Sequence, residues 1–296
     1  MRIRRALTLA LTCALFSALP QAQCAKDYRS DKLAGLILND LTVAGTTSLS
    51  STQLAEIVNA VIGTCFDDSV TVEEMLRASF QDHGYFQAEV KRVSLKSSDP
   101  LAVPKPVTAE ADVAEGPQYR VGEITFLKNH AFPSDRLRQE FLLKPGEVFE
   151  RGKVATGLEG LQRIYGSAGF LDGYCIPDTE FASNATMSLR VTIFEGEQYH
   201  FNKLQIIAEK DAADRLEAKW ELREGAVYDA QYIDQFIDAN HDSLPQGFTT
   251  QNVQVIHNCP KALVDIRLIV DPAQDRMKPP PQDIPCEEKD KKRTAE

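Results

Sequence analysis

The stretch EGPQYRV at residues 115–121 recurs 80 residues later as EGEQYHF at residues 195–201. A self-match at a fixed spacing of this size is typical of a chain that uses one structural unit more than once. Each copy follows a run in which apolar and polar residues alternate, turns at a glycine and leads into another such run. We therefore predict that the repeated stretch joins consecutive units.

The residues between the two copies predict a strand, two helices and two further strands. Residues 121–126 and 185–194 alternate with the period of strands, and apolar residues at 154, 158, 161 and 165 share one helix face. The break between the helices, LKPGEVF at 143–149, returns as LREGAVY at 222–228. A glycine followed by an aromatic residue is predicted to end the second helix of every unit, at Gly84, Gly169 and Gly247.

These patterns predict an α+β fold of three tandem β-α-α-β-β units. Each unit is expected to be a small three-stranded sheet with two helices on one face. The predicted units span residues 33–118, 119–198 and 199–272. Residues 273–296 are rich in proline and charge, a composition that favours a disordered tail because it buries little apolar surface.

The first residues have the layout of a secretory signal peptide. Arginines within the first five positions precede an apolar run over residues 6–19, and small residues follow near positions 22–25. We expect residues 1–25 to be removed on export, because the apolar run is short for a bilayer-spanning helix of about 20 residues. The alternative is an uncleaved helix that tethers the protein to a membrane.

The charge and cysteine patterns narrow the classes of partner. The net charge is −10 with no stripe of Lys or Arg, so nucleic acid is not an expected partner. Four cysteines lie beyond the signal peptide and its cleavage region. In an exported protein they can form disulfides, and four cysteines allow three pairings. Cys259 with Cys286 is a candidate pair that would tie the tail to the last unit. The four cysteines are Cys65, Cys175, Cys259 and Cys286.

The sequence contains no pattern that predicts catalytic, cofactor-binding or metal-binding residues. No glycine run has the spacing of a phosphate-binding loop, and no Cys/His pair has the spacing of a zinc site. The five histidines are scattered along the chain. An extracytoplasmic enzyme of unknown class remains an alternative, and it would need polar groups that converge in a cleft.

The unit pattern resembles the polypeptide-transport-associated (POTRA) domain. The residues that carry the resemblance are VGEITF at 121–126, LKPGEVF at 143–149, and residues 158–165 with GFL at 169–171. They are similar to units in the periplasmic part of the outer-membrane protein assembly factor BamA. In that family the array normally precedes a membrane β-barrel, whereas the tail of this chain is too short for eight strands of about ten residues.

The resemblance implies a noncatalytic scaffold or client-binding module in outer-membrane protein assembly or secretion. It implies a location in the periplasm, either free or associated with the outer membrane. It implies partners that are other polypeptides, such as an outer-membrane β-barrel protein or its unfolded clients, with no cofactor and no small-molecule substrate. A membrane-tethered envelope or division-type POTRA protein is the alternative within the same family.

The resemblance also implies that the strand after the second helix is a free sheet edge. These strands would be residues 86–96, 174–181 and 250–256. An extended peptide can pair with the backbone of such an edge. Pro177 has no N–H to donate, so we predict binding on the first or third unit. The candidate residues are Val90, Val93, Val253 and Val255.

Overall fold

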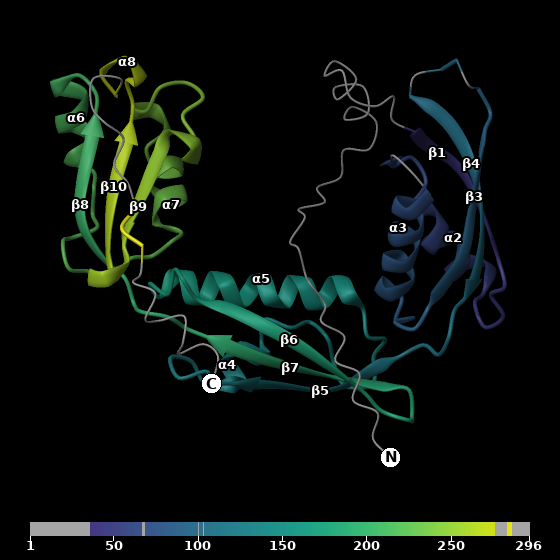
Figure 1. Ribbon diagram of the computed structural model, residues 1–296. Helices are drawn as coiled ribbons and strands as arrows, with labels where there is room; N and C mark the ends of the chain where they lie inside the picture. Colours follow the sequence, from purple (N-terminus) through teal and green to yellow (C-terminus); the bar gives the residue numbers. More distant parts are fainter. Residues whose placement is uncertain (1–35, 67–68, 100, 103, 276–282, 286–296) are drawn as a thin grey trace. The chain divides into compact units, whose positions relative to one another are not determined.

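The computed structural model confirms the α+β fold class, with three small sheets and accompanying helices (Figure 1). It describes residues 36–66, 69–99, 101–102, 104–275 and 283–285. The predicted signal peptide and Cys286 lie outside the described residues.

The chain packs into two compact units, and the division between them runs through the second sheet. One unit holds the described residues up to Thr125 together with residues 141–156 and 177–190. The other holds residues 126–140, 157–176 and the described residues from Val191 onward. The second sheet and its long helix therefore contribute residues to both units.

The first sheet has four strands in the order β2-β1-β4-β3, one more than the three expected. Its central strands β1 and β4 run parallel, and β3 pairs antiparallel with β4. The extra strand forms because the chain turns at Gly63, whose N–H donates to the Leu38 carbonyl at 2.7 Å, and returns beside β1. The strands are β1 (Leu36–Ala44), β2 (Cys65–Phe66), β3 (Glu89–Ser97) and β4 (Lys105–Ala114).

Two helices, α2 (Ser51–Asn59) and α3 (Ser69–Asp82), pack on this sheet. Ser50 begins α2 with a capping box, in which the Ser50 hydroxyl and the Gln53 side chain each accept the other residue's backbone N–H. The Ser79 hydroxyl of α3 donates to the Ile57 carbonyl of α2 at 2.9 Å. The apolar faces of both helices join the sheet in one core.

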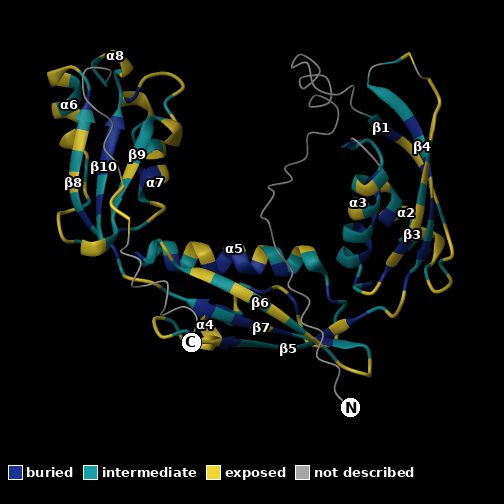
Figure 2. Cartoon of the chain, viewed as in Figure 1, coloured by how far each residue is buried: buried dark blue, intermediate teal, exposed yellow. Residues whose placement is uncertain are grey.

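The second sheet has the strand order β5-β7-β6. Alternate residues of the central strand β7 are buried, which is the pattern of a strand with one face in a core. Figure 2 shows buried positions along both the sheet and its long helix. The elements are β5 (Arg120–Leu127), α4 (Ser134–Arg138), α5 (Arg151–Ser167), β6 (Tyr174–Phe181) and β7 (Thr186–Phe194).

The third sheet has the strand order β8-β10-β9, with β10 parallel to β8 and antiparallel to β9. Val264, Ile266 and Leu268 of β10 are fully buried in a core that also holds Phe236 of α7. The elements are β8 (His200–Ile207), α6 (Lys210–Glu217), α7 (Tyr232–Ala239), β9 (Val253–Asn258), β10 (Leu263–Ile269) and α8 (Pro272–Asp275).

The other face of β10 carries a buried arginine. The Arg267 side chain is 2 % exposed, and one of its guanidinium nitrogens lies 2.6 Å from Asp275 Oδ1 at the end of α8. A second guanidinium nitrogen donates to Gln254 Oε1 on β9 at 3.1 Å. The segment after β10, which was expected to be part of a disordered tail from residue 273, thus begins with a helix that supplies the carboxylate for Arg267.

Replacing Asp275 by Asn should leave the buried Arg267 guanidinium without its counter-charge. We expect the free energy of unfolding to fall by about 1–3 kcal/mol, less than for a fully buried pair because Asp275 is a quarter exposed. Urea unfolding can be followed by the fluorescence of Trp220, which packs against the third core.

Lys203→Gln is the matched control, because it removes an exposed cation from an ion pair in the same sheet, Lys203 with Asp265 at 3.2 Å. Its effect should stay within about 0.5 kcal/mol. Equal losses in the two variants would show that the Arg267–Asp275 pair is no more stabilising than a surface contact.

Candidate functional site

The repeated stretch makes the same hydrogen bonds in both copies. The N–H groups of Tyr119 and Tyr199 each donate, at 2.8 Å, to the carbonyl of the glycine that follows the preceding helix, Gly84 or Gly169. The two tyrosine carbonyls accept N–H groups at 2.9 Å from the next helix break, at residues 149 and 228. Each tyrosine therefore links the end of one helix to the start of the following strand.

The glutamine before each tyrosine adds a further contact at the same helix end. Gln118 Nε2 donates to the His83 carbonyl at 3.0 Å, and Gln198 Nε2 donates to the Ala168 carbonyl at 2.9 Å. These carbonyls belong to the last turn, where a helix leaves acceptors without internal partners.

The glutamate of the stretch holds the loop before the first helix of its own sheet. Glu115 Oε1 accepts the N–H groups of residues 47–48 at 3.1 and 2.6 Å. Glu195 Oε1 accepts those of residues 130–131 at 2.7 and 2.8 Å, and it also accepts the Tyr165 hydroxyl. Burial alone raises the pKa of Glu115, but the hydrogen bonds from Ser48 and Thr47 outweigh it, so the pKa is lowered.

A side chain would be crowded at the two glycines whose carbonyls accept the tyrosine N–H groups. A Cβ on Gly84 would lie 3.1 Å from the Tyr119 carbonyl oxygen, and one on Gly169 would lie 2.8 Å from that of Tyr199. Gly247, at the same place after α7, would meet nothing within 4 Å. All three glycines have positive φ, so they share the same backbone strain on substitution. Gly247 differs from Gly84 and Gly169 in having space for a side chain.

The predicted edge strands β3, β6 and β9 all lie at an outer position of their sheets. The four candidate residues on them are not brought together. Val90 is buried in the first core and Val93 packs against it, whereas Val253 packs against the third core. Val255 is the most open, with 37 % of its surface exposed. Peptide binding by these residues stays a prediction.

The direction of the backbone groups on β9 follows from three hydrogen bonds to residues 283–285. The Ile284 N–H donates to the His257 carbonyl at 2.8 Å, and the Cys259 N–H donates to the Ile284 carbonyl at 3.0 Å. The His257 N–H donates to Asp283 Oδ1 at 2.8 Å. Odd-numbered residues of β9 therefore point their backbone groups away from β10.

This alternation selects Val255 as the informative edge position. Its N–H points outward in the same way as that of His257. The Val253 N–H instead donates to the Thr250 carbonyl, so a proline at Val253 would break a local turn. A proline at Val90 would fall in a buried position beside the bulge of β3, and it would disturb the core.

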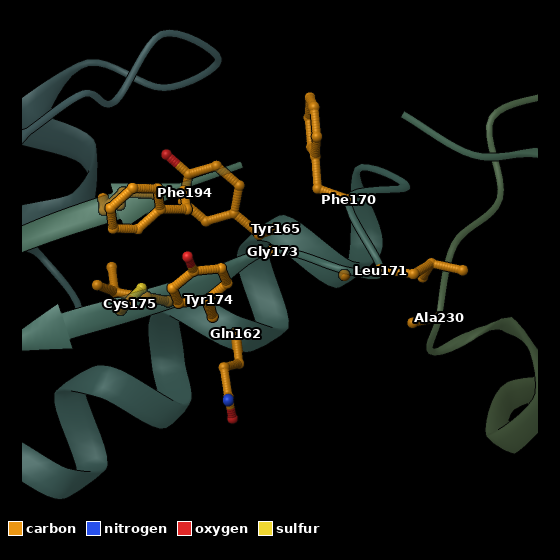
Figure 3. A pocket seen from close by; sticks show the side chains of 12 residues that line it. Gln162, Tyr165, Phe170, Leu171, Gly173, Tyr174, Cys175, Phe194 and Ala230 are labelled. Carbon is orange, nitrogen blue, oxygen red and sulfur yellow. The ribbon is translucent and has the colours of Figure 1, made fainter. Parts of the chain in front are cut away.

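A pocket of about 220 Å³ lies at the start of β6 and the end of α5, with one wall from Ala230 (Figure 3). The Tyr174 ring stacks on Phe194 at a centroid distance of 4.7 Å, and Tyr165 meets Phe170 edge to face. The lining is mainly aromatic and aliphatic carbon. The pocket therefore suits an apolar side chain better than a charged ligand.

Cys175 in this pocket is a free thiol. Burial raises its pKa to about 11, so the thiol stays protonated at neutral pH and is a poor nucleophile and a poor metal ligand. Among the described residues, no group of three His, Cys, Asp or Glu side chains could hold a metal ion. No described helix is both long enough and apolar enough to cross a membrane.

Sequence reasoning missed this pocket, although Tyr174 after Gly173 offered a signal. An aromatic residue at the first position of an edge strand has few neighbours to bury it, and Tyr174 is 42 % exposed. The candidate disulfide between Cys259 and Cys286 stays a prediction, because Cys286 lies outside the described residues.

Comparisons with known proteins match this architecture. Residues 119–196 match the POTRA family model, described as a surface antigen variable number repeat. A putative outer membrane protein assembly factor of Treponema pallidum is 27% identical over 141 residues. That alignment covers 46% of this chain and only 17% of the relative, so the chain spans a small part of the relative's length.

Among solved structures, the chain is similar to POTRA domains 3–5 of Haemophilus influenzae BamA, with a TM-score of 0.57 and 19% sequence identity. The match covers 79% of this chain and 95% of that structure. The POTRA resemblance and the fold class predicted from the sequence are thereby confirmed.

Gly169→Ala should destabilise the protein more than Gly247→Ala. Both changes impose the strain of a positive φ, about 1 kcal/mol, but only the Gly169 methyl group meets the Tyr199 carbonyl. We expect losses of about 2–4 kcal/mol for Gly169→Ala and about 1 kcal/mol for Gly247→Ala. Urea unfolding monitored by Trp220 fluorescence measures both, and matching losses would contradict the role of the close approach.

Glu115→Gln should change how stability depends on pH. A lowered pKa means that the carboxylate stabilises the fold above its unfolded pKa, about 4.5, and that this contribution is lost as the pH falls through the folded value. We expect the variant to be about 1–3 kcal/mol less stable than the wild type at pH 7, and the difference to be smaller at pH 3.

Far-UV circular dichroism during urea unfolding at both pH values provides the measurement. Glu110→Gln on the same strand β4 is the control, because its exposed pair with Lys96 should contribute little at either pH. A Glu115→Gln deficit that is the same at pH 3 and pH 7 would contradict the role of the ionised carboxylate.

Proposed function

We propose that this protein, which carries a POTRA domain at residues 119–196, is a periplasmic scaffold or client-binding module in outer-membrane protein assembly or secretion. The assembly-factor relative and the BamA POTRA fold support this role. We also propose that the three POTRA-like units span residues 33–118, 119–198 and 199–272. The first 25 residues would direct export to the periplasm.

The proposed mechanism is strand addition to a sheet edge. An edge strand offers N–H and C=O groups, and pairing with them tolerates many client sequences because it reads the backbone. The observation that supports this most directly is at the end of β9, where backbone groups of His257 and of the next-but-one residue Cys259 already pair with Ile284 of the same chain. This single bridge supports the proposal of strand addition at this edge.

The proposed role is noncatalytic and needs no cofactor. The thiol in the pocket is held in its protonated form, and the Glu195 and Gln198 side chains of the second repeated stretch are used in hydrogen bonds between elements. The partners would be other polypeptides, in particular an outer-membrane β-barrel protein or its unfolded clients. Binding would require only contact between the edge strand and an extended segment of the partner.

Val255→Pro should weaken client capture, whereas Val255→Thr should not. Proline removes one outward N–H from β9, and threonine keeps it together with a β-branched side chain. Losing one hydrogen bond of about 0.5–1.5 kcal/mol predicts an affinity about 2–10-fold lower. The measurement is the yield of outer-membrane β-barrel polypeptides cross-linked to each variant in the source cells, quantified by mass spectrometry.

The two parts of the proposal fail in different ways. Equal yields from both variants would contradict binding at the β9 edge. Capture of no β-barrel polypeptide by the wild type would contradict the role in outer-membrane assembly.

A further inference from the structure

A short segment near the end of the chain lies alongside the β9 edge. Residues 283–285 are drawn in yellow near the base of β9 in Figure 1. Ile284 pairs with Asn258 in a parallel bridge, through its N–H to the His257 carbonyl and its carbonyl to the Cys259 N–H. Asp283 Oδ1 accepts the His257 N–H. Two outward backbone groups of β9 and the N–H of Cys259, just past its end, are therefore occupied.

We infer that Asp283–Pro285 is a built-in strand that covers the β9 edge and competes with clients for it. The hydrogen bonds themselves show that the segment occupies backbone groups at the end of β9. The competition rests on the proposed function, because it requires that clients pair with the same backbone groups.

The residue types of this segment fit the task of covering an edge. The Asp283 carboxylate gives the His257 N–H a charged acceptor, and Ile284 has the β-branched side chain that favours an extended backbone. Since Ile284 directs both backbone groups at β9, Pro285 is directed to the opposite side. Its missing N–H costs no bond to β9, and it hinders a further strand from adding there.

The noncovalent contacts of the cover are few. Ile284 is 50 % exposed, so its side chain adds little buried apolar surface. The segment is held by a few hydrogen bonds and by its attachment to the chain, which raises its local concentration at the edge. Cys259 is disulfide-bonded, and the candidate pairing with Cys286 would add a covalent tie directly after Pro285. A client strand that also pairs with Val255 would make more backbone bonds than this single bridge.

The test compares Ile284→Pro with Ile284→Val in the full-length protein. Proline removes the N–H that donates to the His257 carbonyl, whereas valine keeps it. We expect the His257 and Cys259 amides to exchange about 10-fold faster in Ile284→Pro and at the wild-type rate in Ile284→Val. The amides of β10 serve as an internal control and should not change.

A second variant, ending after Arg276, removes the segment but keeps Asp275 and its contact with Arg267. Because it also removes Cys286, the candidate partner of Cys259, full-length Cys286→Ser is its control and should keep the wild-type exchange at His257. It should show the same faster exchange, and a synthetic peptide of residues 281–285 should restore protection at His257. Unchanged exchange in both variants would overturn the inference that the segment covers the edge.

Client capture separates this inference from the proposed function. Ile284→Pro should cross-link more outer-membrane β-barrel polypeptide than the wild type, by at least about 2-fold. Faster exchange with unchanged, non-zero capture would overturn the competition. Faster exchange with no capture by any variant would instead overturn the proposed function and leave the covered edge intact.

Discussion

The backbone hydrogen bonds of Tyr119 and Tyr199 are the contacts on which the repeated architecture depends. The N–H of each tyrosine donates to the carbonyl of the glycine that follows one helix. The tyrosine carbonyl accepts an N–H from the loop that precedes the next helix. The Tyr199 carbonyl oxygen would lie 2.8 Å from a Cβ at position 169, and at position 84 a Cβ would lie 2.7 Å from Val148 Cγ1 and 3.1 Å from the Tyr119 oxygen. At Gly247 no such tyrosine follows among the described residues, and the space is open.

One outer strand of each sheet carries a feature that hinders further pairing, and the feature differs from sheet to sheet. Strand β3 carries a bulge between Val90 and Arg92, which interrupts regular pairing. Strand β6 contains Pro177, which has no donor to offer. Strand β9 is partly covered by Asp283–Pro285. The unpaired N–H and C=O groups of an outer strand can pair with any exposed strand. These features reduce the number of backbone groups on β3, β6 and β9 that are open to such pairing.

Much of this arrangement could be predicted from the sequence because its signals are local. The stretch repeated at 115–121 and 195–201 predicted where consecutive units join. The alternation of apolar and polar residues predicted the strands that form the sheets. Strand β2 could not be predicted, because two residues carry no period. The burial of Arg267 depends on Asp275, which lies in a stretch whose composition favours disorder. The single bridge at Ile284 likewise has no periodic signature, since it is flanked by an aspartate and a proline.

The candidate edge residues show why a side-chain pattern does not identify a backbone site. Alternation gives the face on which a side chain lies, whereas strand addition depends on which N–H groups point out of the sheet. On β9 the hydrogen bonds with Ile284 show which backbone groups point out of the sheet. Val255 points its N–H outward, whereas the N–H of Val253 donates to a carbonyl within a local turn. The bridge is parallel, so a client that enters as this segment does would run in the direction of β9 and opposite to β10.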